Sequence, residues 1–333
     1  MKKIVFTLFL LVFLALGLLY FAREKIFSPS DNSPATFQVE SGASAAKIGN
    51  ALETRGLVSS GKLFAWWCRY KKASLKAGWY DVPEKTSIAG IVEIFTAGKT
   101  AVRKVTIPEG RASWEMPAYF RKTIPDFDST RWESIVHDPD FARELGIQAA
   151  SLEGYLLPDT YPIEIGATEK DVARQMVRAN KKLREEMEAK GSPLWKELGG
   201  WHRILTLASV VEEETGKTDE RPLIAGVFIN RLRQGIPLGA DPTVRFIFRN
   251  LTGPIYKSQL QSDNPYNTRR FPGLMPGPIS NPGRKAVEAV LYPQKTDALY
   301  FVAKDDGSGT HFFAGSLSEH NRYKSQAAKN RGE

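Results

Sequence analysis

Residues 204–215 read ILTLASVVEEET, an apolar run that ends in three consecutive glutamates. At about 100° per residue, the apolar side chains fall on one stripe of a helix, and this stripe comprises Ile204, Leu207, Ala208 and Val211. Glu213 then points almost directly away from the stripe, while Glu212 and Glu214 lie on its two flanks. We therefore expect a buried helix that presents two carboxylates to the edge of a cleft.

A carboxyl group held against apolar neighbours is a candidate proton donor, because burial disfavours its charged form and raises its pKa. Cleavage of a glycosidic bond needs such an acid. The simpler alternative is a solvated acidic helix end, although acidic residues at a helix C-terminus oppose the helix dipole. The helical pattern alone does not choose between Glu212 and Glu214.

The sequence around this helix indicates an α-rich domain with long loops and a few strands, which follows a region of mixed helical pattern at 109–150. Its periodicity predicts helices at about 168–190, 202–215, 220–234 and 283–291 and a strand at 299–303. Residues 235–283 are dense in Pro, Gly and Asn, which is typical of functional loops. We assign residues 109–333 to this larger domain.

Residues 36–108 have a different pattern, in which short strands alternate with short helices. Strands are expected at 37–40, 77–82 and 102–107, with helices following Ser44 and at 62–70 and 86–95. Units of this kind resemble the small LysM-like α/β modules that bind N-acetylated glycans. The aromatic side chains of this segment fit either a core or a glycan-binding role, and they are Trp66, Trp67, Trp79 and Tyr80.

The N-terminus carries an uncharged apolar run from Ile4 to Ala22, which is about the length of a bilayer-spanning helix. Because no small-residue cleavage site follows, we expect a retained single-pass anchor over residues 1–26 rather than a cleaved signal peptide. Residues 27–35, FSPSDNSPA, are predicted to be a linker. The expected fold class is therefore α+β: an anchor, a LysM-like module and an α-rich domain.

The net charge of +9 favours an anionic partner, but no nucleic-acid motif accompanies it, so we expect no nucleic-acid binding. The single cysteine, Cys68, excludes an intrachain disulfide and lies between Trp67 and Arg69, which is typical of core packing. His311 and His320 lack a metal-ligand spacing. We therefore expect neither a metal nor another cofactor.

Several stretches beyond residue 150 combine carboxylate, amide, hydroxyl and aromatic side chains, which are the groups that bind sugars. They are residues 152–161 (LEGYLLPDTY), 227–232 (VFINRL), 241–243 (DPT), 266–268 (YNT), 273–279 (GLMPGPI) and 319–321 (EHN). The candidates for substrate binding or support are Glu212, Glu153, Asp159, Asn230, Asp241, Thr243, Tyr266, Asn267, His311 and Asn321. A purely structural role is the alternative for each, and for the Asp-Pro pair it is a turn.

Taken in order, these stretches resemble the MltG-like (YceG-like) endolytic murein transglycosylases over nearly the whole chain. The shared motifs are E-G-x-x-x-P-D-T, A-S-I/V-I/V-E-x-E-T, F-x-N-R-L, D-P-T-V, Y-N-T, G-L-x-P-G-x-I and H-N. The resemblance implies that Glu214, the second Glu of E-x-E-T, is catalytic and that Glu212 supports it. The chain departs from the family pattern at residues 239–240, Gly-Ala instead of Gln-Thr, and at 245–247, which lack the usual Tyr-Gly pair.

The resemblance further implies cleavage of the bond between N-acetylmuramic acid and N-acetylglucosamine in nascent glycan strands, leaving 1,6-anhydro ends. It places the catalytic domain on the extracytoplasmic side of the inner membrane, and it suggests peptidoglycan synthases as partners. Two alternatives remain. One is a membrane-anchored scaffold that binds glycan without cutting it. The other is a hydrolase that pairs Glu214 with Glu153 or Asp159.

Overall fold

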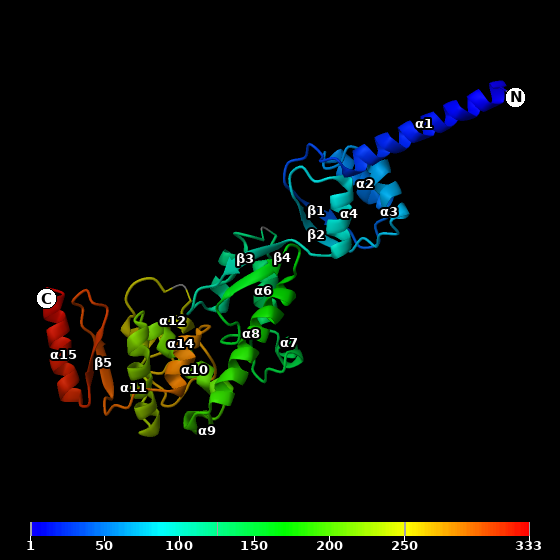
Figure 1. Ribbon diagram of the computed structural model, residues 1–333. Coiled ribbons are helices and arrows are strands. Elements are labelled where there is room, and N and C mark those ends of the chain that lie inside the picture. Colours follow the sequence, from blue (N-terminus) through cyan, green and yellow to red (C-terminus); the bar gives the residue numbers. More distant parts are fainter. Residues whose placement is uncertain (1, 125, 250, 333) are drawn as a thin grey trace. The chain divides into compact units, whose positions relative to one another are not determined.

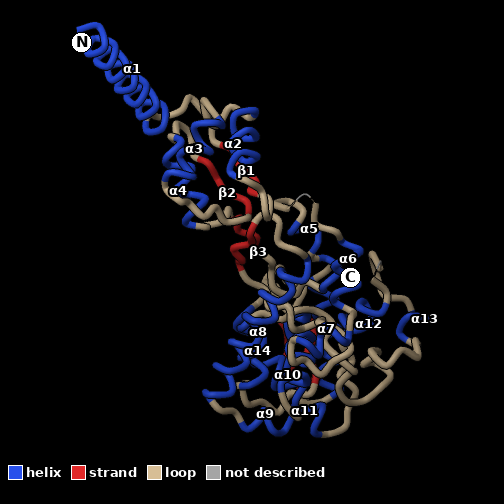
Figure 2. Tube along the Cα trace, turned by 90° about the vertical axis from the view of Figure 1, so that its right-hand side faces the viewer, coloured by secondary structure: helices blue, strands red, loops and turns tan. Residues whose placement is uncertain are grey.

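The computed structural model describes residues 2–124, 126–249 and 251–332. The chain forms two compact units (Figures 1 and 2), of which the first comprises Met1–Arg103 with Pro162–Ala167 and the second Lys104–Tyr161 with Thr168–Glu333. Helices dominate the fold, and within the described residues the strands pair into three two-stranded sheets, β1–β2, β3–β4 and β5–β6. This is a mixed, helix-rich α+β protein.

The first unit begins with the long helix α1 (Lys2–Phe27), and its segment Phe6–Phe27 is long and apolar enough to cross a membrane. The side chains from Phe6 to Phe21 are exposed, as expected for a helix without protein neighbours. Near the end of α1 the environment changes, because Ile26 is only 2% exposed and belongs to the core of the module that follows. The end of α1 is therefore part of the folded module.

The segment after α1 is held in place by Asn32, a buried residue within the stretch predicted to be a linker. Its amide Nδ2 donates to the carbonyl of Pro83 at 2.7 Å, and its Oδ1 accepts from the backbone N–H of Thr86 at 2.9 Å. Two hydrogen bonds to one buried amide fix a loop that has little apolar surface of its own.

The module contains strands β1 (Ala35–Val39) and β2 (Gly78–Val82) and helices α2 (Ala45–Thr54), α3 (Gly61–Tyr70) and α4 (Ile88–Ala97). Strand β3 (Val102–Thr106) begins at the end of this unit and continues into the second. Strands β1 and β2 pair antiparallel with Phe37 opposite Tyr80. Serine side chains cap the three helices by accepting backbone N–H groups, and they are Ser44, Ser60 and Ser87. Each element agrees with the sequence prediction to within a few residues.

The aromatic residues of the module divide between its core and its surface. Tyr80 is fully buried, and Trp67 is buried beside Cys68. Burial raises the pKa of that thiol to about 11, so it is an inert packing residue. Trp66 and Tyr70, in contrast, are 45% and 67% exposed on the outer face of α3.

The second unit is built around helix α10 (Trp201–Glu214), which packs against α11 (Arg221–Arg233) and α14 (Arg284–Leu291). From Ile204 to Val211 every residue of α10 is buried. The helix is thus enclosed on all sides, whereas the sequence predicts burial of a single apolar stripe. A helix surrounded in this way holds the residues at its end in fixed positions.

The remaining elements of the second unit surround this centre. They are η1 (Ser113–Glu115), α5 (Pro117–Phe120), α6 (Ser129–Val136), α7 (Pro139–Glu144), α8 (Glu169–Lys190), α9 (Pro193–Leu198), η2 (Thr218–Glu220), α12 (Asp241–Ile247), α13 (Lys257–Leu260), β5 (Tyr300–Ala303), β6 (His311–Ala314) and α15 (Leu317–Asn330). Strand β4 (Thr160–Glu164) is divided between the two units. The predicted helices α8, α10, α11 and α14 and strand β5 are confirmed. Helix α15 and the hairpin strand β6 were not predicted.

Candidate active site

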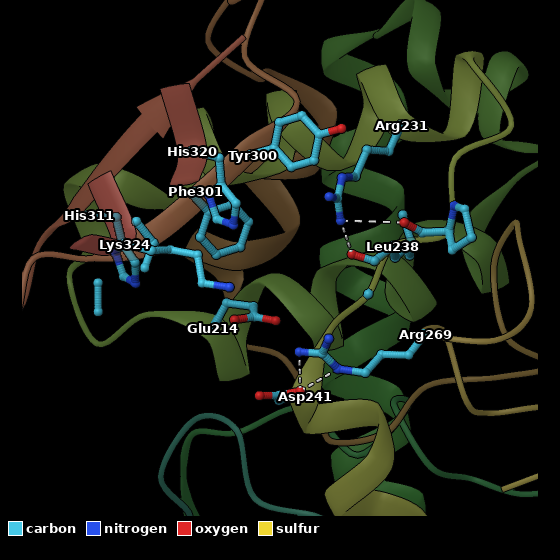
Figure 3. Close-up of a pocket in the computed structure, with 14 residues that line it drawn as sticks. Glu214, Arg231, Leu238, Asp241, Arg269, Tyr300, Phe301, His311, His320 and Lys324 are labelled. Carbon is cyan, nitrogen blue, oxygen red and sulfur yellow. Dashed lines mark hydrogen bonds and ion pairs between the residues drawn. The ribbon is translucent and has the colours of Figure 1, made fainter. Parts of the chain in front are cut away.

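Glu214 is the last residue of α10, and the chain becomes extended at Thr215. Its side chain is half-buried. It borders a cleft of about 620 Å³ that contains residues from α10, α11, α12, the β5–β6 hairpin and α15 (Figure 3). The cleft residues are Glu214, Arg231, Pro237, Leu238, Gly239, Asp241, Arg269, Tyr300, Phe301, Val302, Ala303, His311, His320 and Lys324.

A second cleft, of about 400 Å³, meets the first at Glu214 and Asp241, which line both. Its walls include aromatic and charged side chains from the segments near residues 110–115, 241–249 and 279–280. The Trp114 and Phe246 rings lie 5.3 Å apart, and the Arg249 guanidinium lies over Trp114 at 4.2 Å. The carboxylate at the end of α10 thus has open space on two sides.

The pKa of Glu214 is raised to about 8, mainly by burial and secondly by the charge of Asp241, whereas Arg269 and Arg231 oppose the shift. Since desolvation penalises the charged form, this carboxyl holds its proton at neutral pH. A group with such a pKa can donate a proton and take one back under the same conditions.

Glu213 is exposed and lines the second cleft, so it points away from the buried apolar stripe as the helical pattern predicts. Desolvation within the cleft raises its pKa to about 7, and the hydroxyl of Ser280 opposes the shift. Gly110 makes room for this side chain: a Cβ at Gly110 would lie 2.6 Å from Glu213 Oε1, and its φ of +76° also favours glycine. Glu213 is therefore a second protonatable carboxyl at this site.

Glu212 is buried rather than placed at the cleft edge. Its carboxylate forms an ion pair with buried Arg221 of α11 and accepts the backbone N–H of Gly283 at 2.9 Å. These contacts join α10 to α11 and to the start of α14. The geometry gives Glu212 a structural role beside the site.

Asp241, the first residue of α12, accepts a hydrogen bond from Arg269 Nε at 2.6 Å. Both side chains are exposed at the mouth of the first cleft. Arg231 is occupied by backbone carbonyls, since its Nε donates to Leu299 at 2.6 Å and its Nη1 to Leu238 at 2.5 Å. Arg231 thus fixes the loop that precedes α12.

His311 lies in the first cleft but is bound to Glu220, whose carboxylate accepts both its backbone N–H and its Nδ1, at 2.9 and 2.8 Å. His320, from α15, stacks on Tyr300 with ring centroids 5.2 Å apart. Burial lowers the pKa of His320, and Lys324 and Arg231 add to this effect. These effects favour the neutral form of the imidazole.

Three polar residues predicted at the site are held within the fold. Asn230 donates to the carbonyls of Thr296 and Ala298 at 2.7 and 3.2 Å. Buried Asn267 donates to two carbonyls of its own loop, and buried Thr243 bonds Ala240 and Thr268. Thr243 and Asn267 shape the loops that carry Asp241 and Arg269, Asn230 holds the segment that leads into β5, and none of the three lines either cleft.

Tyr266 is half-buried and stacks with Phe246 at 4.9 Å, which places it behind the wall of the second cleft. Burial raises the pKa of its hydroxyl. It supports an aromatic residue of the cleft rather than lining the cleft itself.

The other predicted residues lie apart from the two clefts. Glu153 is buried and accepts hydrogen bonds from Ser113 and Asn281, including 2.7 Å from the serine hydroxyl. Burial raises its pKa to about 7. Asp159 and Asn321 are exposed, and neither lines the clefts at Glu214.

Sequence reasoning missed several cleft residues, namely Trp114, Arg269, Tyr300 and Lys324. Arg269 directly follows the Y-N-T motif, so its position could have identified it as a candidate cleft residue. Trp114 lies in a stretch without a recognisable pattern, and Lys324 is on the unpredicted helix α15. Among the described residues, no group of three or more His, Cys, Asp or Glu is arranged to hold a metal ion.

Comparison with known proteins identifies the family. A model of the YceG-like family matches residues 37–326. An endolytic murein transglycosylase of Bacillus subtilis is 30% identical over 96% of this chain and 93% of its own. One of Streptococcus pneumoniae is 29% identical over 86% of this chain but only 57% of its own length. The crystal structure of a yceG-like protein from Listeria monocytogenes is 30% identical, with a TM-score of 0.60 over 87% of this chain and 99% of its own. The chain belongs to the YceG-like family.

Proposed function

We propose that this protein is an endolytic murein transglycosylase that cuts the bond between N-acetylmuramic acid and N-acetylglucosamine. Two relatives with matches over most of this chain carry the name endolytic murein transglycosylase. The observation that carries the proposal is the position of Glu214, a carboxyl with a pKa raised to about 8 where two clefts meet. A polymer bound across this point extends into space on both sides, as internal cutting of a strand requires.

In the proposed reaction, Glu214 donates its proton to the oxygen that links the two sugars, and the bond from that oxygen to the muramyl C1 breaks. The positive charge that develops at C1 is captured by the 6-hydroxyl of the same muramyl residue. The ionised Glu214 accepts the proton of that hydroxyl and returns to its starting state. The products are a free N-acetylglucosamine hydroxyl and a 1,6-anhydro ring, so no water is consumed.

Two features of the site support this assignment of roles. Asp241 raises the pKa of Glu214 and lies beside it in both clefts, where its negative charge also stabilises a developing cation at C1. Trp114 and Phe246 provide apolar ring faces in the second cleft, on which sugar rings stack.

A hydrolase with two carboxylates is the nearest enzymatic alternative. Glu153 is buried under Ser113 and Asn281, and Asp159 lies outside both clefts, so neither is placed to act with Glu214. Asp241, Glu213 and Glu115 are the other carboxylates among the residues that line the two clefts, and with any of them the product would carry a reducing end.

For the first unit we propose a membrane anchor at α1, followed by a LysM-like module, with the catalytic unit on the extracytoplasmic side of the inner membrane. The apolar length of α1 and the helices that pack on the β1–β2 sheet support these assignments. Peptidoglycan synthases are proposed as partners. The non-catalytic scaffold remains the alternative, and the activity of the purified protein tests it.

Product analysis tests the proposed function directly. The full chain in detergent is incubated with uncrosslinked murein strands, and the ends are identified by mass spectrometry. We expect 1,6-anhydro ends at internal positions, in the presence or absence of a chelator. Reducing ends would identify a hydrolase, and intact strands would leave the scaffold as the better interpretation. The full chain is required because a protein that begins at residue 27 lacks Ile26 from its core.

A further inference from the structure

The outer face of α3 is aromatic and basic, in contrast to its buried face. Residues at helical spacing point outward and are exposed, namely Lys62, Trp66, Arg69 and Tyr70. The Trp66 and Tyr70 rings stack at 5.5 Å with an interplanar angle of 10°. Two large stacked rings in solvent are unusual for a surface helix that has no partner.

The segment that carries this face is basic, and Glu53 lies at its start, where its carboxylate accepts the backbone N–H of Gly61 at 2.9 Å. Residues 54–80 contain no aspartate or glutamate. The basic residues of the same segment are Arg55, Lys62, Arg69, Lys71, Lys72 and Lys76. A surface with this composition attracts an anionic partner and repels a cationic one.

Helix α3 also contacts the end of the apolar helix α1. The rings of Phe27 and Trp67 meet edge to face at 5.1 Å, and Ile26 is inserted into the module core. On the other side of the junction, a cavity is lined by residues of α1 and of the segment that leads into α3, among them Phe21, Glu24, Lys25, Asp31, Gly56, Val58 and Ser59. The module is thus packed around the last turns of α1, beside α3 (Figure 2).

The dimensions of a bilayer give the depth of this junction. Arg23, Glu24 and Lys25 are the first charges after the apolar run, so they mark the edge of the hydrocarbon region. Phe27 lies four residues beyond Arg23, about 6 Å along the helix axis. The headgroup layer on each side of a bilayer is about 5 to 7 Å thick. Trp67, in contact with Phe27, therefore falls at headgroup depth.

We propose that the outer face of α3 is a membrane-binding surface, with Trp66 and Tyr70 in the headgroup layer and the neighbouring basic residues on anionic lipid phosphates. This inference rests on the proposed anchoring of α1. Aromatic side chains with polar edges prefer this layer, and lysine and arginine pair there with phosphates. A glycan is the other occupant to consider, but the contact between α3 and the end of α1 favours lipid.

Fluorescence quenching by lipid tests the proposal on the full chain. The protein is placed in nanodiscs of anionic phospholipid, with and without bromine atoms on the upper part of the acyl chains. We expect brominated lipid to quench the wild type, and Trp66→Phe to lose the larger part of the quenchable emission. The matched control is Trp79→Phe, which replaces a half-buried tryptophan of the same module. This variant should keep the larger part of the quenchable emission. Thermal unfolding of both variants verifies that the module is folded.

Charge reversal provides a second, independent readout. Lys62→Glu with Arg69→Glu should reduce the quenching in anionic nanodiscs. Lys181→Glu with Lys182→Glu, two exposed lysines on α8, should leave it unchanged. Equal effects of the two pairs would contradict the proposal.

The remaining outcomes separate the alternatives. Equal quenching of Trp66→Phe and Trp79→Phe would overturn the proposal. If lipid leaves Trp66 unquenched and added murein strands shift its emission, the face belongs to glycan. Release of the protein from membranes by alkaline carbonate would overturn the anchoring and this inference together. Strand cleavage is measured on the same samples, so failure of the enzymatic proposal is recognised separately.

Discussion

Glu214 and Asp241 border the same two clefts, and the negative charge of Asp241 raises the pKa of Glu214. One residue ends α10, and the other begins α12. Arg269 moderates this coupling, because it is bound to Asp241 and lowers the pKa of Glu214. The acidity of the proposed proton donor is therefore set by two neighbours that can be changed separately.

Replacement of Glu214 by glutamine should abolish strand cleavage without unfolding the protein. The amide keeps the shape of the side chain but has no proton to donate, so the rate should fall by about 10²- to 10⁴-fold. The matched control is Glu213→Gln at the adjacent position, which should retain most of the activity. If Glu213→Gln is the inactive variant, the proton donor is Glu213. The activity of both variants is measured by mass spectrometry as the release of anhydro-muramyl ends.

Cleavage should decline as the pH rises through about 8, the pKa of Glu214, because only the protonated carboxyl can act as the acid. Substitution of its neighbours should move this alkaline limb in opposite directions. Asp241→Asn removes a charge that raises the pKa and should shift the limb to lower pH. Arg269→Gln removes a charge that lowers the pKa and should shift it to higher pH, each by up to about one unit. Identical profiles for the two variants would rule out Glu214 as the titrating group.

Glu214 should also make stability depend on pH. Its pKa is about 8 in the folded chain and 4.5 as a model value, so between these values the folded state binds more protons than the unfolded state. Stability therefore falls as the pH rises across this window, and below it the group contributes no pH dependence. Glu214→Gln should remove this loss and be more stable than wild type at pH 9 by about 1 to 3 kcal/mol. Urea unfolding at pH 4 and pH 9 measures it, and equal stabilities at pH 9 would contradict the shifted pKa.

Glu212→Ala should destabilise the second unit by about 3 to 5 kcal/mol, because it leaves Arg221 buried without its main partner. The effect on catalysis should follow the fraction of folded protein. Denaturant unfolding together with activity per folded molecule distinguishes this role from a chemical one. A fully stable but inactive variant would assign Glu212 to the reaction.

Trp114→Ala should weaken substrate binding and should leave the rate of the chemical step almost unchanged. The ring lies in the second cleft against Phe246, and its loss should raise the substrate concentration needed for half-maximal rate about 10-fold. The maximal rate should change little. A selective fall in the maximal rate would instead show that Trp114 positions the reacting bond.

Much of this fold can be predicted from the sequence, because its helices carry strong local signals. Serine residues are frequent helix N-caps, and three helices of the first unit begin after such a residue, namely Ser44, Ser60 and Ser87. The buried part of α10 is mostly apolar, which also predicts a helix. Helix α15 lacks this signal, since among its residues only Ala327 is buried. Its polar sequence gives no apolar face to detect.

The composition of the cleft is harder to predict, because long-range contacts create it. Asp241 and Arg269 are 28 positions apart, and their loops are held together by hydrogen bonds of Thr243 and Thr268. Motif residues such as Asn230 and Asn267 were expected to touch substrate, yet they bond backbone carbonyls. A sequence can indicate that a polar residue is important for a loop. It does not indicate whether the side chain points into the cleft or toward the backbone.

The end of α10 presents three chemically identical side chains at successive angular phases of a single helix. Glu212 is turned into the interior, Glu213 into one cleft and Glu214 to the junction of both. Loss of one residue from within α10 would rotate this set by about 100°. One carboxylate would then lie in the interior without the ion pair that Arg221 now provides. Another would approach the proposed substrate site from a different direction around the helix axis. Which carboxylate can act in the proposed reaction thus depends on helical phase, so the length of α10 matters to the proposed site as much as its composition does.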